Sequence, residues 1–162
     1  MEKTTTTKKS GSFAGTVLLT ALLAGTLDML GAIFNYMING GKNPTVIFQY
    51  IASAVFGKTA YDGSISMMAA GLLFHYIIAF IFTLFFFLLF PKLKLLAVNS
   101  FIAAILYGIF VWAVMNLIVL RLTRLAPVPF DLQKAAIAAL ILILCIGLPI
   151  VISAKKYYAH RP

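Results

Sequence analysis

The stretch Gly25-Thr-Leu-Asp28-Met-Leu-Gly31-Ala-Ile-Phe-Asn35 decides how the rest of the chain is interpreted. It places a carboxylate and an amide inside the first long apolar run, residues 13–38. A helix over this run, at about 1.5 Å per residue, is long enough to cross a hydrocarbon core of about 30 Å. An ionisable side chain at membrane depth is costly, so it faces a protein interior or a wet cavity and needs a partner. We therefore expect Asp28 to face other helices.

The composition identifies the class of protein. Of the 162 residues, 62% are hydrophobic and only 10% are charged, which leaves too little polar surface to cover a soluble core. The net charge of +9 comes from lysines and arginines at the ends of the apolar runs, where they meet lipid headgroups. The single cysteine, Cys145, cannot form an internal disulfide and is expected to be a small buried hydrophobe. The sequence predicts an all-α integral membrane protein whose partner is the lipid bilayer, with no nucleic acid partner.

Four apolar runs predict a four-helix bundle. The expected spans are residues 13–38, 65–90, 96–120 and 134–154. A basic head over residues 1–12 is expected to be disordered, and a basic tail covers residues 155–162. Pro149 removes a helical hydrogen bond, so we expect a bend near the end of the fourth span.

A shorter segment lies between the first two spans. Helix breakers crowd residues 39–44, and Asn43 before Pro44 is typical of a helix start. The apolar residues of 44–57 then recur at three- and four-residue steps, which indicates a helix too short to span. We expect an interfacial helix there, and a re-entrant segment is the alternative.

The distribution of basic residues predicts the orientation. With four spans, both termini and the second loop share one side of the membrane and carry eight lysines and arginines, against five on the other side. The positive-inside rule then places both termini in the cytoplasm.

The antiparallel layout brings polar residues of different spans to similar depths. Asp28 and His75 both lie a few ångström beyond the middle of their spans on the same side, so we expect them to meet. His75 shares one helix face with Gly71 and Ala79, which permit close approach of a neighbouring helix.

Two asparagines lie nearer the outer surface. Asn35 and Asn116 share a level there, and Asn35 is seven residues from Asp28 on the same helix face. The four residues form the candidate polar seam, namely Asp28, His75, Asn35 and Asn116.

Each of these residues also has a structural explanation. Asp28 and His75 can satisfy each other and set the helix register, although the cost of an ionisable pair at this depth also favours a function. For the asparagines we favour a role in helix packing.

No motif indicates catalysis or a cofactor. The chain has no phosphate loop, nucleophile elbow, paired cysteines or zinc signature. Met67 and Met68 near His75 are expected to pack rather than bind copper. Haem is rejected because His75 is the one histidine within a span. We predict no catalytic residue, metal or cofactor, and no enzyme activity.

The layout resembles a known family. Four spans, a long first loop and the segment Pro127-Val-Pro129-Phe-Asp131-Leu132 before the last span are similar to the YagU-like family of uncharacterised bacterial inner-membrane proteins. This chain is shorter, and its last span, with Cys145-Ile-Gly147-Leu-Pro149, lacks the polar character associated with that family. The resemblance implies the bacterial cytoplasmic membrane and a link to acid tolerance, but carries over no catalytic residues.

Two functional hypotheses follow. In the first, the protein is a proton- or small-solute-handling module in which Asp28 and His75 change protonation along the polar seam. Four short helices leave little room for a pathway, so a homo-oligomer or a membrane partner protein would help. In the second, it is a structural or accessory membrane protein whose polar residues only fix helix packing.

Overall fold

The computed structural model describes residues 12–92, 99–123 and 131–159. The expectation of a disordered head falls almost wholly outside these residues, as does the end of the basic tail. Within the described part the chain is helical and contains no strand.

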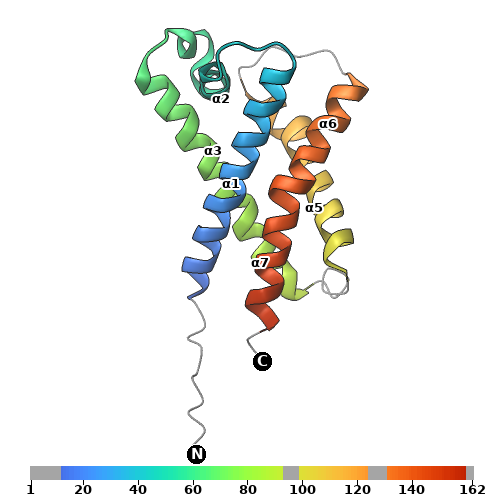
Figure 1. Ribbon diagram of the computed structural model, residues 1–162. Helices are drawn as coiled ribbons and strands as arrows, with labels where there is room; N and C mark the ends of the chain where they lie inside the picture. The colour runs from blue at the N-terminus through green and yellow to red at the C-terminus, as the bar shows by residue number, and fades with distance from the viewer. Residues whose placement is uncertain (1–11, 93–98, 124–130, 160–162) are drawn as a thin grey trace, which may run out of the picture.

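Four helical segments are long and apolar enough to cross a membrane (Figure 1). The first is α1 (Phe13–Ile38), and the second is α3 (Ile65–Leu89) with the short turn η2 (Phe90–Lys92). The third joins α5 (Ser100–Val114), η3 (Met115–Val119) and η4 (Leu120–Leu122). The fourth joins α6 (Leu132–Leu142), η5 (Ile143–Gly147) and α7 (Leu148–Ala159). The predicted all-α fold, with four helices suited to a membrane bundle, is confirmed.

The first span has the bounds expected from sequence, and the fourth extends beyond them. Each of the four segments begins with a side-chain cap that accepts a backbone N–H in the first turn. The caps are Ser12, Ser64, Asn99 and Asp131. The Asp131 cap starts the fourth span two residues before the expected position.

The non-spanning helix is α2 (Thr45–Phe56), followed by the turn η1 (Gly57–Tyr61). The Asn43 side chain accepts hydrogen bonds from the backbone N–H and the hydroxyl of Thr45, at 3.1 and 2.7 Å. Both elements lie at the end of the bundle opposite the start of α1 and the end of α7 (Figure 1). The ring centroids of Phe13 and Tyr157 are 5.7 Å apart, which joins those two helix ends.

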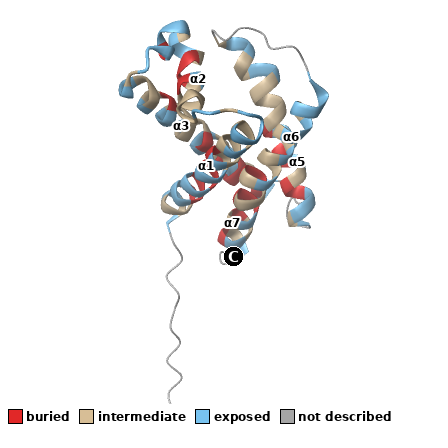
Figure 2. Cartoon of the chain, turned by 45° about the horizontal axis from the view of Figure 1, so that its top comes forward, coloured by how far each residue is buried: buried red, intermediate tan, exposed pale blue. Residues whose placement is uncertain are grey.

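The core lies in the half of the bundle near these two ends. Its large buried side chains include Phe86 and Phe87 from α3 and Ile150 and Val151 from α7. Tyr107 of α5 joins this core by donating a hydrogen bond to the Phe82 carbonyl. Figure 2 shows buried residues along the inner sides of these helices and on one side of α2.

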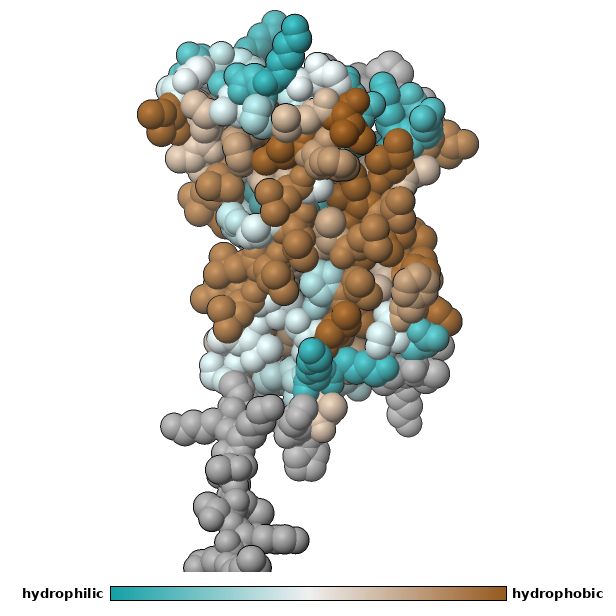
Figure 3. Space-filling model, viewed as in Figure 1, coloured by the Kyte–Doolittle hydropathy of each residue, from teal (hydrophilic) through white to brown (hydrophobic). Residues whose placement is uncertain are grey.

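The outward faces are apolar. Leu19 is 70% exposed and Leu73 is 59% exposed. In Figure 3 such residues form a hydrophobic belt across the middle of the molecule, with hydrophilic residues above and below it. Exposing so large an apolar surface to water would be unfavourable, so these faces contact lipid.

Glycines permit two close backbone contacts. A Cβ built on Gly108 would lie 2.5 Å from the Cα atom of Ile143, and one on Gly147 would lie 2.4 Å from the Ala104 carbonyl oxygen. The pairs Ala104/Gly108 and Ile143/Gly147 therefore lock α5 onto η5, as small residues do in membrane helices.

The fourth span widens where the sequence predicted a bend. Residues Ile143–Gly147 form a π-helical turn directly before Pro149. Pro149 has no N–H, so it gives no helical hydrogen bond to the Cys145 carbonyl, and its ring disfavours a regular helix over that carbonyl. A π-turn is one way for a helix to accommodate such a residue.

Candidate functional site

Three chemically distinctive side chains lie near the middle of three spans. Asp28 is two to three residues past the centre of α1, and His75 is three to four residues from the centre of its span, or about 4 and 5 Å toward the α2 end. Cys145 lies at the centre of the fourth span. We call Asp28, His75 and Cys145 the midplane cluster.

His75 is held by the backbone of α1. Its Nε2 atom lies 2.7 Å from the Gly25 carbonyl oxygen. A carbonyl can only accept, so Nε2 carries a hydrogen and donates it. The other ring nitrogen, Nδ1, is then the atom that can gain or lose a proton. The bond orients the ring toward the level of Asp28, because a helical carbonyl points along the axis toward the next turn.

Asp28 interacts electrostatically with the other two members of the cluster. It is half-buried, and it is close enough to His75 and to Cys145 for its charge to act on both. No ion pair with an N–O distance within 4.0 Å joins Asp28 to His75, and no described residue donates a hydrogen bond to this carboxylate. His75 thus bonds to α1 at Gly25, three residues before Asp28, and the structure does not pair the Asp28 and His75 side chains directly.

The contact between α1 and α3 includes a hydroxyl pair that the sequence analysis missed. The Thr26 and Tyr76 hydroxyl oxygens are 2.8 Å apart, and the Thr26 hydroxyl also donates to the Leu22 carbonyl. A Cβ on Gly25 would lie 3.0 Å from the Tyr76 ring, so the absence of a side chain at Gly25 leaves space for the Tyr76 ring. The position of Tyr76 directly after His75 was the available signal, but a tyrosine in an apolar run does not reveal which helix it faces.

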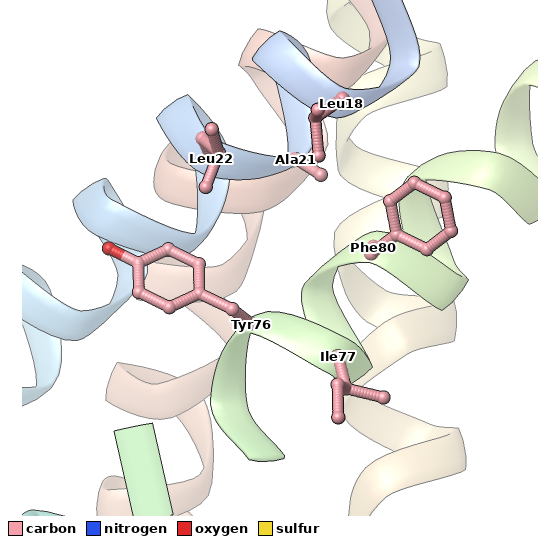
Figure 4. Close-up of a pocket in the computed structure, with 6 residues that line it drawn as sticks. All are labelled: Leu18, Ala21, Leu22, Tyr76, Ile77 and Phe80. Atoms are coloured by element: carbon pink, nitrogen blue, oxygen red, sulfur yellow. The ribbon is translucent and has the colours of Figure 1, made fainter. Parts of the chain in front are cut away.

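An apolar groove lies beside this hydroxyl pair. It has a volume of about 190 Å³ and is formed by α1 and α3. Figure 4 shows the Tyr76 ring extending from α3 toward α1, with Ile77 and Phe80 on the same helix. The other lining residues, Leu18, Ala21 and Leu22, come from α1. The groove is hydrophobic on all sides and belongs to the lipid-facing surface rather than to the polar site.

Cys145 lies in the π-turn η5, next to α1. A Cβ on Gly31 would lie 2.8 Å from an Ile141 methyl group and 3.4 Å from the Cys145 sulfur, so this part of α1 packs on the widened turn. Pro149 follows this turn by two residues in the same span. The sequence analysis expected a bend at this proline but did not connect it to Asp28.

The two asparagines of the predicted seam are bonded within their own helices. The Asn39 amide donates to the Asn35 side-chain oxygen at 3.2 Å and to the Asn35 carbonyl at 2.7 Å. The Asn116 amide, in the π-turn η3, donates to the Trp112 carbonyl of α5 at 2.8 Å. Neither contacts Asp28 or His75 by a hydrogen bond in the described part of the chain. The site built by the structure is therefore the midplane cluster, and a seam through Asn35 and Asn116 stays a prediction.

The described residues contain no group of three His, Cys, Asp or Glu side chains placed to hold a metal ion. The chemistry available at the midplane cluster is accordingly that of a carboxylate, an imidazole and a thiol.

This chain matches no known protein family, no curated protein and no solved structure. The resemblance to the YagU-like family therefore stays a prediction.

Proposed function

We propose that the protein is a proton-handling membrane module in which the Asp28 carboxylate binds and releases a proton. The observation that supports this function is that Asp28 lies near the middle of its span and yet receives no hydrogen bond from a described residue. A solute moved together with the proton would be small, because the described helices pack closely around the site.

The energetic argument separates this proposal from a purely structural role. A buried polar group without a hydrogen bond costs about 1–3 kcal/mol, and a charged group costs more. Packing between α1 and α3 is already secured by the Thr26–Tyr76 and His75–Gly25 bonds, which do not involve Asp28. A carboxylate retained only for packing would be expected to accept such bonds itself.

The chemistry follows from the position of the imidazole. Nε2 of His75 stays bonded to the Gly25 carbonyl, so Nδ1 is the atom that exchanges a proton with Asp28. Because no direct ion pair within 4.0 Å joins the two side chains, one water molecule is a suitable carrier between them. The Asp28 and His75 pair then has two states of equal net charge. In one, a neutral carboxylic acid faces a neutral imidazole, and in the other a carboxylate faces an imidazolium.

Carbodiimide labelling tests whether Asp28 takes up a proton in the membrane. An apolar carbodiimide reacts with a protonated carboxyl group: the carboxyl proton moves to a carbodiimide nitrogen, the carboxylate oxygen bonds to the central carbon, and rearrangement leaves a stable N-acylurea. The chain has only four acidic residues. We expect labelling of Asp28 near neutral pH, its loss on raising the pH, and none on the exposed Asp62 and Asp131.

Asp28→Asn is the matched control, because the amide has the size of the carboxyl group and cannot react. An Asp28 that stays unlabelled at every pH at which the protein remains folded would refute the proposal. Proton flux into vesicles containing the purified protein, compared between the wild type and Asp28→Asn, then shows whether the proton crosses the membrane.

The second candidate function is that of a structural or accessory membrane protein. The hydrogen bonds from Tyr76 to Thr26 and from His75 to the Gly25 carbonyl favour it, because both join α1 to α3 near the middle of the membrane. Under this alternative, Asp28→Asn leaves vesicle permeability unchanged, while disruption of the hydroxyl pair lowers stability.

We further propose that the protein lies in the bacterial cytoplasmic membrane with both termini in the cytoplasm. The eight-to-five distribution of basic residues supports this orientation. A cysteine introduced at the exposed Lys58 of η1 should react with an impermeant thiol reagent from outside the cell. Reaction from the cytoplasmic side alone would reverse the orientation.

A further inference from the structure

Helix α2 has its polar side chains on the inside. Gln49 is 8% exposed and Ser53 is 2% exposed, whereas Val55 on the same helix is 50% exposed. An amphipathic helix at the membrane surface has the opposite arrangement, with its polar face toward water and headgroups. The exposed residues of α2 include Tyr50 and Phe56, which also suit lipid.

The Gln49 amide is buried without a partner in the described part of the chain. Ser53 donates its hydroxyl to the Tyr50 carbonyl at 2.7 Å, but no described residue forms a hydrogen bond with the Gln49 side chain. None of the described side-chain N or O atoms is both sealed from solvent and unpaired. The Gln49 amide is therefore not completely covered by protein atoms, although the residue as a whole is more than nine-tenths buried.

The register of α3 relates the position of α2 to that of the midplane cluster. A Cβ on Gly71 would lie 2.0 Å from the Phe48 carbonyl oxygen, so α2 crosses α3 at Gly71 with its backbone in contact. His75 follows Gly71 by four residues and lies on the same face of α3, about 6 Å further toward the midplane. The crossing at Gly71 thus puts the segment that carries Gln49 beyond His75, on the α2 side of the bundle.

We propose that α2 is embedded in the membrane, with Val55 and Phe56 against lipid, and that Gln49 lines a water-filled access path to the midplane cluster. This inference rests on the proposed function only in assigning the path to the proton of Asp28. The ligand of the path is water or a hydrated proton, since an amide can both donate to and accept from either. The embedded position corresponds to the re-entrant alternative for this segment rather than to an interfacial helix.

Thiol labelling tests the path without depending on protonation of Asp28. In a Cys145→Ala background, single cysteines replace Gln49, Ala52 and Val55 in turn, and the proteins are reconstituted into phosphatidylcholine vesicles. An impermeant, charged methanethiosulfonate reacts only with a thiolate in contact with water, because the thiol in lipid stays protonated. We expect Gln49→Cys to react about tenfold faster than both controls. Ala52 is fully buried and Val55 is exposed, so the two controls separate burial from contact with lipid.

The possible outcomes are distinct. Reaction at Gln49→Cys alone supports the path. Fast reaction at Val55→Cys would place α2 at the aqueous surface, and no reaction at Gln49→Cys would show a dry interior; either result overturns the inference. If carbodiimide fails to label Asp28 while Gln49→Cys reacts, the result supports the water-filled path and refutes the proton-handling function.

A second reporter covers the case in which Gln49→Cys does not fold. His75→Cys places the thiol at the inner end of the path, and adding Gln49→Leu should slow its labelling about tenfold by removing the amide that binds water. Tyr50→Phe, on the exposed side of the same helix, is the matched control and should leave the rate unchanged. An unchanged rate in the Gln49→Leu variant overturns the inference.

Discussion

The contact between α5 and the π-turn η5 allows a quantitative test of the packing. In Gly108→Ala the new Cβ would meet the backbone of Ile143, with its Cα atom at 2.5 Å and its N atom at 2.8 Å. Ordinary van der Waals contacts begin at about 3.4 Å, so the two backbones must separate by nearly 1 Å. Overpacking of this kind costs about 1–3 kcal/mol in protein cores.

Gly31→Ala is the matched control because it makes the same chemical change in another span. There the new Cβ would lie 2.8 Å from an Ile141 methyl group, which can rotate away, and 3.4 Å from the Cys145 sulfur. Both variants gain the same helix propensity, of about 1 kcal/mol in water, so the difference between them isolates the backbone clash.

The assay is reversible unfolding in mixed micelles, followed by circular dichroism. We expect Gly108→Ala to be less stable than Gly31→Ala by about 1–3 kcal/mol. Equal stability of the two variants would refute the interpretation that backbone contact at Gly108 holds α5 against η5.

Three further predictions concern individual side chains. On unfolding, His75→Leu should cost about 1–3 kcal/mol because it leaves the Gly25 carbonyl without its donor, whereas Asp28→Asn should cost little because no described residue bonds to that carboxylate; an equal cost for Asp28→Asn would show that the carboxylate supports the packing. Tyr76→Phe should cost about 1 kcal/mol in the same assay, and adding Thr26→Val should cost little more if the two hydroxyls act as a pair. A hydrogen bond from a backbone N–H in the first turn of α6 keeps the pKa of the Asp131 carboxyl below 3.8. The ionised Asp131 cap therefore contributes fully to the stability of α6 at pH values above 3.8, and this contribution is lost as the pH falls through the pKa of the folded state. Amide exchange in that turn should therefore speed up in acid, and Asp131→Asn, which still caps the helix, should remove this pH dependence.

Much of the fold could be predicted from the sequence because the membrane imposes simple rules. A helix in lipid must satisfy its own backbone hydrogen bonds, so an apolar run of sufficient length predicts a span without knowledge of its neighbours. The run over residues 13–38 has the same bounds as α1. The fourth span illustrates the limit, because its start depends on the Asp131 cap, which lies outside the apolar run.

Part of the site could also be predicted. Depth along a helix follows from residue number, so antiparallel spans place Asp28 and His75 at similar levels. The rotation of each helix about its axis does not follow from residue number. That rotation decides that Asn35 and Asn116 bond within their own helices while Tyr76 bonds to Thr26.

The sequence by itself determined the class of protein, the apolar spans and the depth of the ionisable residues, since each depends on composition and on the rise per residue. Only the tertiary structure decided which groups are paired. In it, His75 bonds to the Gly25 carbonyl, and Gln49 is buried on a helix whose backbone contacts Gly71 of α3. Such pairings depend on how closely two backbones approach, and one missing Cβ at a crossing point is enough to change them.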